Sequence, residues 1–167
     1  MKQLLLIRHG KSSWDSASTA DHDRPLNERG LQDAPATAKA LRGKGVSPDG
    51  IYSSAALRAA TTAKLVAEGL DYPTDQISYG DALYLASPGT LLRIIQQFDE
   101  GHNVVMMFGH NPGMHEVVNL LAQGDLVDSF PTLSVARLDL DIAFWGEAGP
   151  GCASLNELIT PRLLKQQ

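Results

Sequence analysis

The sequence predicts an α/β fold of three layers (α/β/α), in which a mostly parallel central sheet lies between two layers of helices. Short apolar runs alternate along the chain with segments whose apolar residues recur at helical spacing. The runs are apolar at successive positions rather than at every second one, which is typical of strands buried on both faces. This alternation is the pattern of a parallel sheet covered by crossover helices.

The first strand is expected at residues 3–7, and a long polar loop follows at residues 9–26. Asn27 has the side chain of a helix N-cap, and Gly43 and Gly45 end the helix that follows it. The later strands are expected at residues 51–53, 76–79, 103–108, 133–140 and 154–159. The later helices are expected after a cap at Ser54, from Ser87-Pro88 to Phe98, and from Met114 to Ala122.

The length of 167 residues predicts one domain spanning residues 1–167. A net charge of -5 argues against nucleic acid as a partner, because such binding usually leaves a basic surface. Cys152 is the only cysteine, so an internal disulfide is excluded and a reducing compartment fits. The sequence shows no signal peptide and no apolar stretch near the roughly 18 residues of a membrane helix. We therefore expect a cytoplasmic protein with no membrane partner.

Two phosphate-handling motifs overlap in the stretch IRHGKSSW, which runs from Ile7 to Trp14. Gly10-Lys11-Ser12 matches the end of a nucleotide-binding P-loop, whereas Arg8-His9-Gly10 matches the start of a site with a histidine nucleophile. A P-loop needs a glycine five positions before its Gly-Lys-Ser. That position is Leu5, inside a strand-like run that cannot fold around phosphates. The sequence therefore favours the Arg-His-Gly interpretation.

Arginines and histidines follow three of the expected strands. The first strand ends at Arg8-His9, the second leads through Ser53-Ser54 to Arg58, and the strand at 103–108 ends at Gly109-His110-Asn111. Ligands of open α/β sheets bind at the carboxyl ends of strands, so we expect these side chains to converge. Arginine grips phosphoryl oxygens bidentately, a neutral imidazole can attack phosphorus, and a protonated second histidine can stabilise the charge. The arginines supply positive charge, so no metal or cofactor is expected.

At these residues the sequence resembles the histidine phosphatase superfamily, which has the phosphoglycerate-mutase-like fold. The segments "RHG", "SSAALRAATTA" and "GHNPG" match its pattern in order and spacing, and "DHDRPLNERG" resembles its SixA branch of bacterial phosphohistidine phosphatases. The likeness extends to "ALYLASP" and "LITPRLL". The resemblance implies that His9 is the nucleophile and that Arg8, Arg58 and His110 form the phosphate pocket. Gly10 and Asn111, in the same motifs, are further candidates for binding substrate.

One position departs from the family pattern. Relatives that act on alcohol phosphates generally carry a glutamate shortly after the third strand, where this chain reads Leu83-Tyr84-Leu85. An alkoxide leaving group needs such a positioned acid, an effect of about 10²–10⁴ in rate. An imidazole titrates near about pH 6.5 and can take its proton from water. The site is therefore expected to favour P–N bonds, although Asp21, Asp23 and Glu116 stay open as acids that could reach the pocket.

Several other polar residues are expected to play lesser parts. Arg24 is expected to hold the long loop, and Cys152 to be inert. Trp14 either lines the pocket mouth or serves packing. Three histidines without metal-ligand spacing are expected to be solvated: His22, His102 and His115.

Three functions follow from these residues. The first is a metal-independent phosphatase that hydrolyses protein phosphohistidine through a covalent intermediate on His9. The second is a phosphatase or mutase for small alcohol phosphates, and the third is a non-catalytic phosphate-binding module. The resemblance implies a phosphohistidine-bearing partner, such as a phosphotransfer domain of a signal-transduction system. Phosphate and mimics such as vanadate are expected to bind the pocket.

Overall fold

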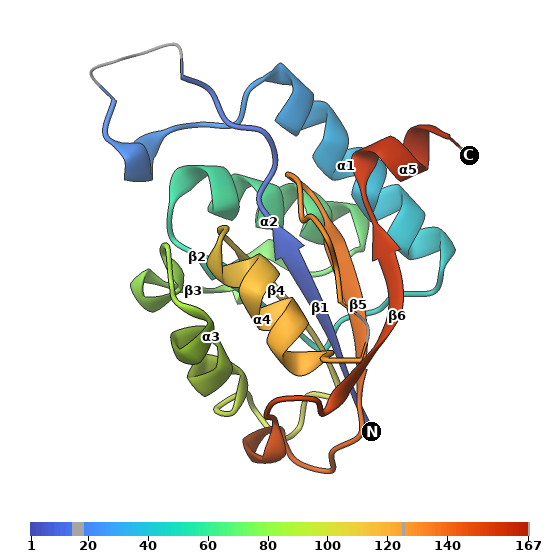
Figure 1. Cartoon of the computed structure of the whole chain (residues 1–167). Helices are drawn as coiled ribbons and strands as arrows, with labels where there is room; N and C mark the ends of the chain where they lie inside the picture. Colours follow the sequence, from blue (N-terminus) through green and yellow to red (C-terminus); the bar gives the residue numbers. More distant parts are fainter. Residues whose placement is uncertain (15–18, 125, 167) are drawn as a thin grey trace.

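The computed structural model describes residues 1–14, 19–124 and 126–166, and its centre is a six-stranded sheet (Figure 1). Residues 15–18 of the expected polar loop lie outside the described part. The strands lie in the order β3-β2-β4-β1-β5-β6. Their bounds are β1 (Lys2–Arg8), β2 (Gly50–Ser54), β3 (Ser78–Gly80), β4 (Val104–Gly109), β5 (Val135–Leu140) and β6 (Ala153–Ile159).

The sheet is mostly parallel, as the sequence predicts. β1 pairs in parallel with β4, β4 with β2, and β2 with β3. β5 runs opposite to the other described strands, because it pairs antiparallel with both β1 and β6. The carboxyl ends of β1, β2 and β4 therefore meet at one edge of the sheet, next to the start of β5.

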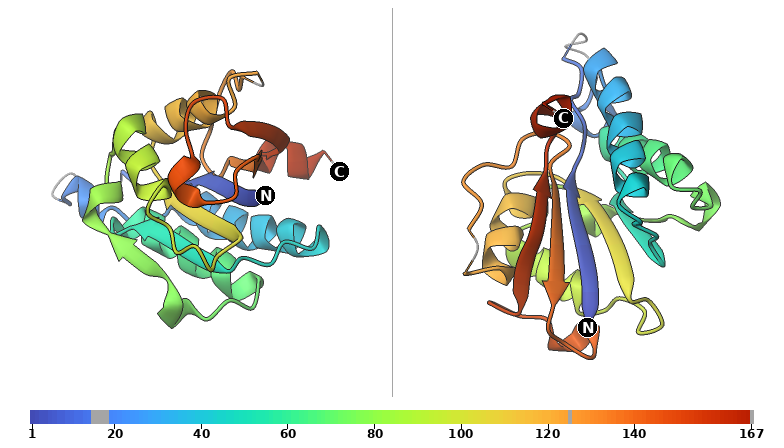
Figure 2. Two further views of the ribbon diagram at one scale, coloured as in Figure 1. Left: turned by 90° about the horizontal axis from the view of Figure 1, so that it is seen from below. Right: turned by 90° about the vertical axis from the view of Figure 1, so that its right-hand side faces the viewer.

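Helices cover both faces of the sheet, which gives the three expected layers (Figure 2). α1 (Glu28–Gly43) and α2 (Leu57–Gly69) lie on one face, and α3 (Pro88–Ile95) and α4 (Gly113–Leu121) lie on the other. The short α5 (Pro161–Lys165) packs beside α1. The described residues also contain four 3₁₀ turns: η1 (Asp21–Asp23), η2 (Thr74–Gln76), η3 (Asp81–Leu83) and η4 (Trp145–Glu147).

The apolar run of β1 is explained by the core on each side of it. Leu4 and Leu6 point into the cluster under α3 and α4, whereas Leu5 and Ile7 point into the cluster under α1 and α2. All four side chains are completely buried, so neither face of the strand can tolerate a polar residue. Burying one such side chain contributes roughly 1.5–3 kcal/mol.

The helix starts follow the expected caps at two places and differ at a third. Asn27 Oδ1 accepts the Gly30 N–H at 3.0 Å, and Ser87 Oγ accepts the Thr90 N–H at 3.2 Å. The prediction that Ser54 caps α2 is wrong, since that helix begins at Leu57 and Ser54 Oγ accepts the Ala56 N–H instead. Phe98 lies beyond the end of α3 and stacks on Tyr52. No helix among residues 1–14, 19–124 and 126–166 is long and apolar enough to cross a membrane.

Candidate active site

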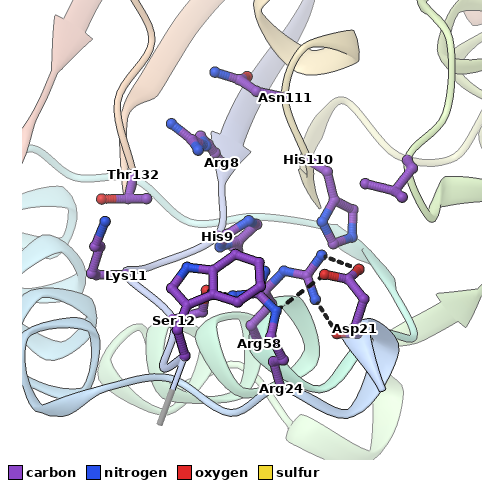
Figure 3. Close-up of a pocket in the computed structure, with 12 residues that line it drawn as sticks. Arg8, His9, Lys11, Ser12, Asp21, Arg24, Arg58, His110, Asn111 and Thr132 are labelled. Carbon is purple, nitrogen blue, oxygen red and sulfur yellow. Dashed lines mark hydrogen bonds and ion pairs between the residues drawn. The ribbon is translucent and has the colours of Figure 1, made fainter. Parts of the chain in front are cut away.

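A pocket of about 310 Å³ opens at the carboxyl edge of the sheet (Figure 3). Five short segments and α2 contribute its described walls, so residues far apart in sequence meet there. The lining side chains are Arg8, His9, Lys11, Ser12, Trp14, Asp21, Arg24, Arg58, Leu85, His110, Asn111 and Thr132. The four residues expected to form the catalytic centre, Arg8, His9, Arg58 and His110, are thus brought together.

The strand register places the two histidines at the same level. Arg8 at the end of β1 pairs with Gly109 at the end of β4. His9 and His110 therefore leave neighbouring parallel strands side by side, and their ring centroids lie 5.1 Å apart. The His9 N–H donates to the Gly109 carbonyl, and the Leu133 N–H donates to the His9 carbonyl, which fixes the backbone of His9 on both sides.

His9 is a neutral imidazole held in one tautomer. Its Nδ1 lies 2.7 Å from the Gly10 carbonyl oxygen, which can only accept, so Nδ1 carries the proton and Nε2 the lone pair. Burial lowers the pKa of His9 to about 4, with further lowering by Arg58, Arg8 and Arg24. At neutral pH this side chain is therefore a nucleophile with its lone pair on Nε2.

His110 is also neutral. Burial first, and then His9 and Arg58, lower its pKa to about 3. Its Nε2 lies 2.8 Å from Ser54 Oγ, and its Nδ1 is buried with no hydrogen-bond partner among the described residues. Ser54 Oγ accepts the Ala56 N–H and can donate its own proton to Nε2, and in that tautomer the ring proton of His110 lies on Nδ1. His110 is thus suited to act as a neutral N–H donor, rather than as the cation considered from the sequence.

The two expected arginines are held by backbone carbonyls. Arg8 Nη1 donates to the Phe130 carbonyl at 3.2 Å, and Arg58 Nη1 donates to the Asp21 carbonyl at 2.6 Å. The Nε atoms of both arginines are buried without a partner among residues the structure describes. Guanidinium groups offer five N–H donors each, so both retain donors for an oxyanion.

Arg24 belongs to the pocket as well as to the loop. Its Nη1 donates to Ser12 Oγ at 2.9 Å and its Nε to Asp21 Oδ1 at 3.1 Å, which braces the loop as the sequence predicts. Its guanidinium carbon also lies 3.4 Å from the ring centroid of Trp14, so Trp14 lies at the pocket mouth. No spacing in the sequence places Arg24 beside the catalytic pair.

Asp21 contributes a carboxylate to the pocket. Its Oδ2 accepts from Arg58 Nη2 at 3.0 Å and from the Tyr84 hydroxyl. The bond from Tyr84, followed by those from Arg58 and Arg24, lowers the pKa of Asp21 to about 2. Asp21 is therefore ionised at neutral pH and is unsuited to the role of proton donor.

The other two candidate acids lie elsewhere. Asp23 is 73% exposed and its carboxylate faces His22 at 3.7 Å, and Glu116 is exposed in the first turn of α4. Within the described residues, no group of three or more His, Cys, Asp or Glu side chains is placed to hold a metal ion.

Gly10 and Asn111 serve the shape of the site. The Gly10 N–H donates to Thr62 Oγ1 at 3.0 Å, and a Cβ at Gly10 would press on Leu26 and Gly30. Asn111 lines the pocket, but its Nδ2 donates to the Phe130 carbonyl at 2.8 Å and its Oδ1 accepts the His115 N–H. Both residues thus have structural partners in addition to the phosphate contacts expected of them.

Comparison with known proteins agrees with this geometry. The family model of the "Histidine phosphatase superfamily (branch 1)" matches residues 4–79. The uncharacterised protein Rv1276c of Mycobacterium tuberculosis is 32% identical over 165 residues, covering 93% of this chain and 100% of that relative. The chain belongs to the histidine phosphatase superfamily, and it is a phosphatase with the phosphoglycerate-mutase-like fold.

Within that superfamily the chain is similar to SixA proteins. The phosphohistidine phosphatase SixA of Escherichia coli K12 is 28% identical, with 98% of this chain and 96% of the relative covered. A structure of the protein histidine phosphatase SixA complexed with tungstate superimposes with a TM-score of 0.83 at 26% identity. That superposition covers 97% of this chain and 99% of the SixA chain.

Proposed function

We propose that this phosphatase hydrolyses phosphohistidine carried on a protein, through a covalent phosphohistidine intermediate on His9. The observation that carries the proposal is the neutral His9 ring, whose Nδ1 bond to Gly10 leaves the lone pair on Nε2 among three arginines. The similarity to SixA along nearly the whole chain supports the same substrate class.

The charge of the pocket matches a phosphoryl dianion. The pocket contains three arginines, Arg8, Arg24 and Arg58, and one carboxylate, Asp21, so these four side chains have a net charge of +2. Both histidines are neutral and add no charge. The exposed Lys11 adds a further cation at the edge. Planar guanidinium groups bind phosphoryl oxygens through paired N–H donors. The pocket can therefore hold the phosphoryl group while its charge is redistributed in the transition state.

In the first step, the lone pair of His9 Nε2 attacks phosphorus. A bond forms between Nε2 and phosphorus, and the bond between phosphorus and the substrate imidazole breaks. The substrate imidazole carries a proton from solvent on its other nitrogen, keeps the electron pair of the broken bond, and so leaves as a neutral ring. The Gly10 carbonyl favours the step, because it stabilises the Nδ1 proton while positive charge develops on the His9 ring.

The absence of a protonated carboxyl group among the described lining residues favours P–N over P–O cleavage. Among the described residues that line the pocket, Asp21 is the one with an acidic side chain, and that side chain is ionised at neutral pH. A small alcohol phosphate would lack the positioned acid that its leaving group needs. Trp14 and Leu85 are exposed where they line the pocket, so a phosphohistidine on a protein surface can reach it. The proposed partner is a cytoplasmic signalling protein that carries a phosphotransfer domain.

The test measures phosphate release, with a metal chelator present, from a histidine-phosphorylated protein and from a panel of small phosphomonoesters. We expect faster release from phosphohistidine, and a loss of about 10³-fold or more in His9→Ala because the nucleophile is gone. The same variant should still bind phosphate, since the arginines remain. His102→Asn removes a histidine outside the pocket and should leave the rate unchanged.

Each other outcome points to a different function. Preferential release from a monoester would favour a phosphatase for small alcohol phosphates. No turnover and no labelled His9 with any substrate would leave a phosphate-binding module. Substantial activity in His9→Ala would contradict the covalent mechanism.

A further inference from the structure

Asp21 joins Arg24, Arg58 and Tyr84 at the pocket, and the transfer of the phosphoryl group to His9 does not use it. Oδ2 accepts from the Tyr84 hydroxyl and from Arg58 Nη2 at 3.0 Å, and Oδ1 accepts from Arg24 Nε at 3.1 Å. The Asp21 backbone carbonyl accepts a further bond from Arg58 Nη1 at 2.6 Å. Figure 3 shows the carboxylate beside Arg58 and below His110.

These contacts fix the carboxylate but leave it accessible to water. The side chain is 41% exposed although its partners Arg24 and Arg58 are buried. A carboxylate offers about four lone-pair positions, and the three bonds from Tyr84, Arg58 and Arg24 leave one of them on Oδ1. This position can accept a hydrogen bond from a water molecule in the pocket, whose lining includes Asp21.

Tyr84 holds the Asp21 carboxylate from a distant segment of the chain. It stands in the stretch where relatives acting on alcohol phosphates carry a glutamate, and its hydroxyl points to Asp21. Its ring also lies edge-on to His110, with centroids 5.4 Å apart. The carboxylate of this pocket therefore comes from the loop before α1, and Tyr84 holds it in place.

We propose that Asp21 orients the water molecule that hydrolyses the phosphohistidine formed on His9, and so acts in the second half of the reaction. This inference rests on the proposed function, because it requires a phosphoenzyme. An ionised carboxylate can accept a hydrogen bond from water but cannot donate a proton to a leaving group, which assigns Asp21 to this half and not to the first.

The step balances with water as the only co-reactant. The water oxygen forms a bond to phosphorus while the bond between phosphorus and His9 Nε2 breaks. The electron pair of the broken bond returns to Nε2, which restores the neutral ring with its proton on Nδ1. One water proton passes by way of the Asp21 carboxylate to a phosphate oxygen, and the product leaves as H₂PO₄⁻.

The test follows labelled phosphate on the enzyme after rapid mixing with a ³²P-phosphohistidine protein and quenching at alkaline pH. In Asp21→Asn we expect the labelling of His9 to keep nearly its normal rate, whereas loss of the label slows by about 10²-fold. Phosphoenzyme should therefore accumulate to a larger fraction of the variant than of the wild-type protein. Tyr84→Phe should slow the same step to a smaller extent, because it only loosens Asp21.

Asp23→Asn is the matched control, since it removes a carboxylate two residues away that faces His22 instead of the pocket. It should behave as the wild type. Melting temperature and tungstate binding show whether each variant keeps its fold and its pocket. Equal slowing of labelling and of label loss in Asp21→Asn would overturn the inference and leave Asp21 a role in fixing the loop.

The two proposals fail in different ways. If wild-type protein and Asp21→Asn both turn over substrate but neither carries label on His9, the covalent function itself is wrong. If wild-type protein is labelled and Asp21→Asn loses the label at the wild-type rate, only the role of Asp21 is wrong.

Discussion

Burial determines the protonation of both pocket histidines. His9 is 7% exposed and His110 is 2% exposed, and desolvation is the largest cause of the lowered pKa of each ring. Arginine side chains close by add to the effect, because a second positive charge there is unfavourable. The reactive form of His9 is thus a consequence of its position at the end of a buried strand.

This protonation predicts how stability depends on pH. The folded-state pKa values, about 4 for His9 and about 3 for His110, lie below the unfolded value of 6.5. As the pH falls below 6.5 the unfolded chain binds protons that the folded protein does not, so the free energy of unfolding should decrease. Urea unfolding between about pH 7 and pH 5 measures the slope, because this interval lies above the ordinary pKa of 3.8 at which Asp21 titrates in the unfolded chain.

The control is a double variant, His9→Gln with His110→Gln. Its stability should change less over the same pH interval, since the two groups responsible are absent. An equal slope in the double variant would assign the acid sensitivity to other side chains.

The sequence identified the side chains that follow strands, and it missed those whose position depends on long-range contacts. Arg8, His9 and His110 are predictable because parallel strand ends share one edge of the sheet. The Tyr84–Asp21 hydrogen bond joins residues 63 apart in sequence, and no spacing rule indicates it. The segment "DHDRPLNERG" resembles the SixA branch and contains both candidate acids, but only the fold distinguishes Asp21 from Asp23.

The start of α4 depends on a glycine. A Cβ at Gly113 would lie 1.9 Å from the Ala86 carbonyl oxygen, so the helix can approach the segment before α3 only without a side chain there. This close approach brings the "GHNPG" turn, and with it His110, against the pocket. Packing of the two helices and geometry of the site are therefore linked at one position.

We expect Gly113→Ala to destabilise the protein by about 1–3 kcal/mol, because the backbone must move to relieve the overlap. Its activity should fall as well, since His110 precedes the displaced helix. Gly43→Ala is the matched control in α1, where a Cβ would meet nothing within 4 Å. That variant should be unchanged or slightly more stable in chemical denaturation, and equal effects of the two would contradict the packing explanation.

Strand positions were predictable, but strand directions and the shortest helices were not. The run at 133–140 reads as a strand whichever way it points, and β5 is antiparallel because it returns directly beside β1 and then pairs with β6. α5 and the four 3₁₀ turns contain too few residues to show periodicity. The end of α3 at Ile95 reflects tertiary packing of Phe98 on Tyr52 and Trp145, which no local pattern encodes.

The molecule concentrates positive charge in one place although it is acidic as a whole. The chain carries a net charge of -5, whereas three arginines and Lys11 surround the pocket. Long-range attraction of an anion is therefore weak, and binding depends on contacts made inside the pocket.

A phosphate mimic should accordingly stabilise the whole fold through this one site. At 100 times its dissociation constant, tungstate or vanadate should add about 2.7 kcal/mol to the free energy of unfolding. That corresponds to a rise of about 5–10 °C in melting temperature for a chain of this size. Arg58→Ala should remove most of the rise, and Arg93→Ala, on the exposed surface of α3, should keep it. A rise that persists in Arg58→Ala would place the anion elsewhere.

The central position of β1 has a consequence for how the chain folds during synthesis. Its two neighbours in the sheet are β4, which begins at Val104, and β5, which begins at Val135. At ribosomal rates of about 5–20 residues per second, roughly 5–20 seconds pass before β4 emerges to pair with it. During that time an apolar segment with both edges open is available for wrong pairing, which makes the nascent chain a candidate for chaperone binding.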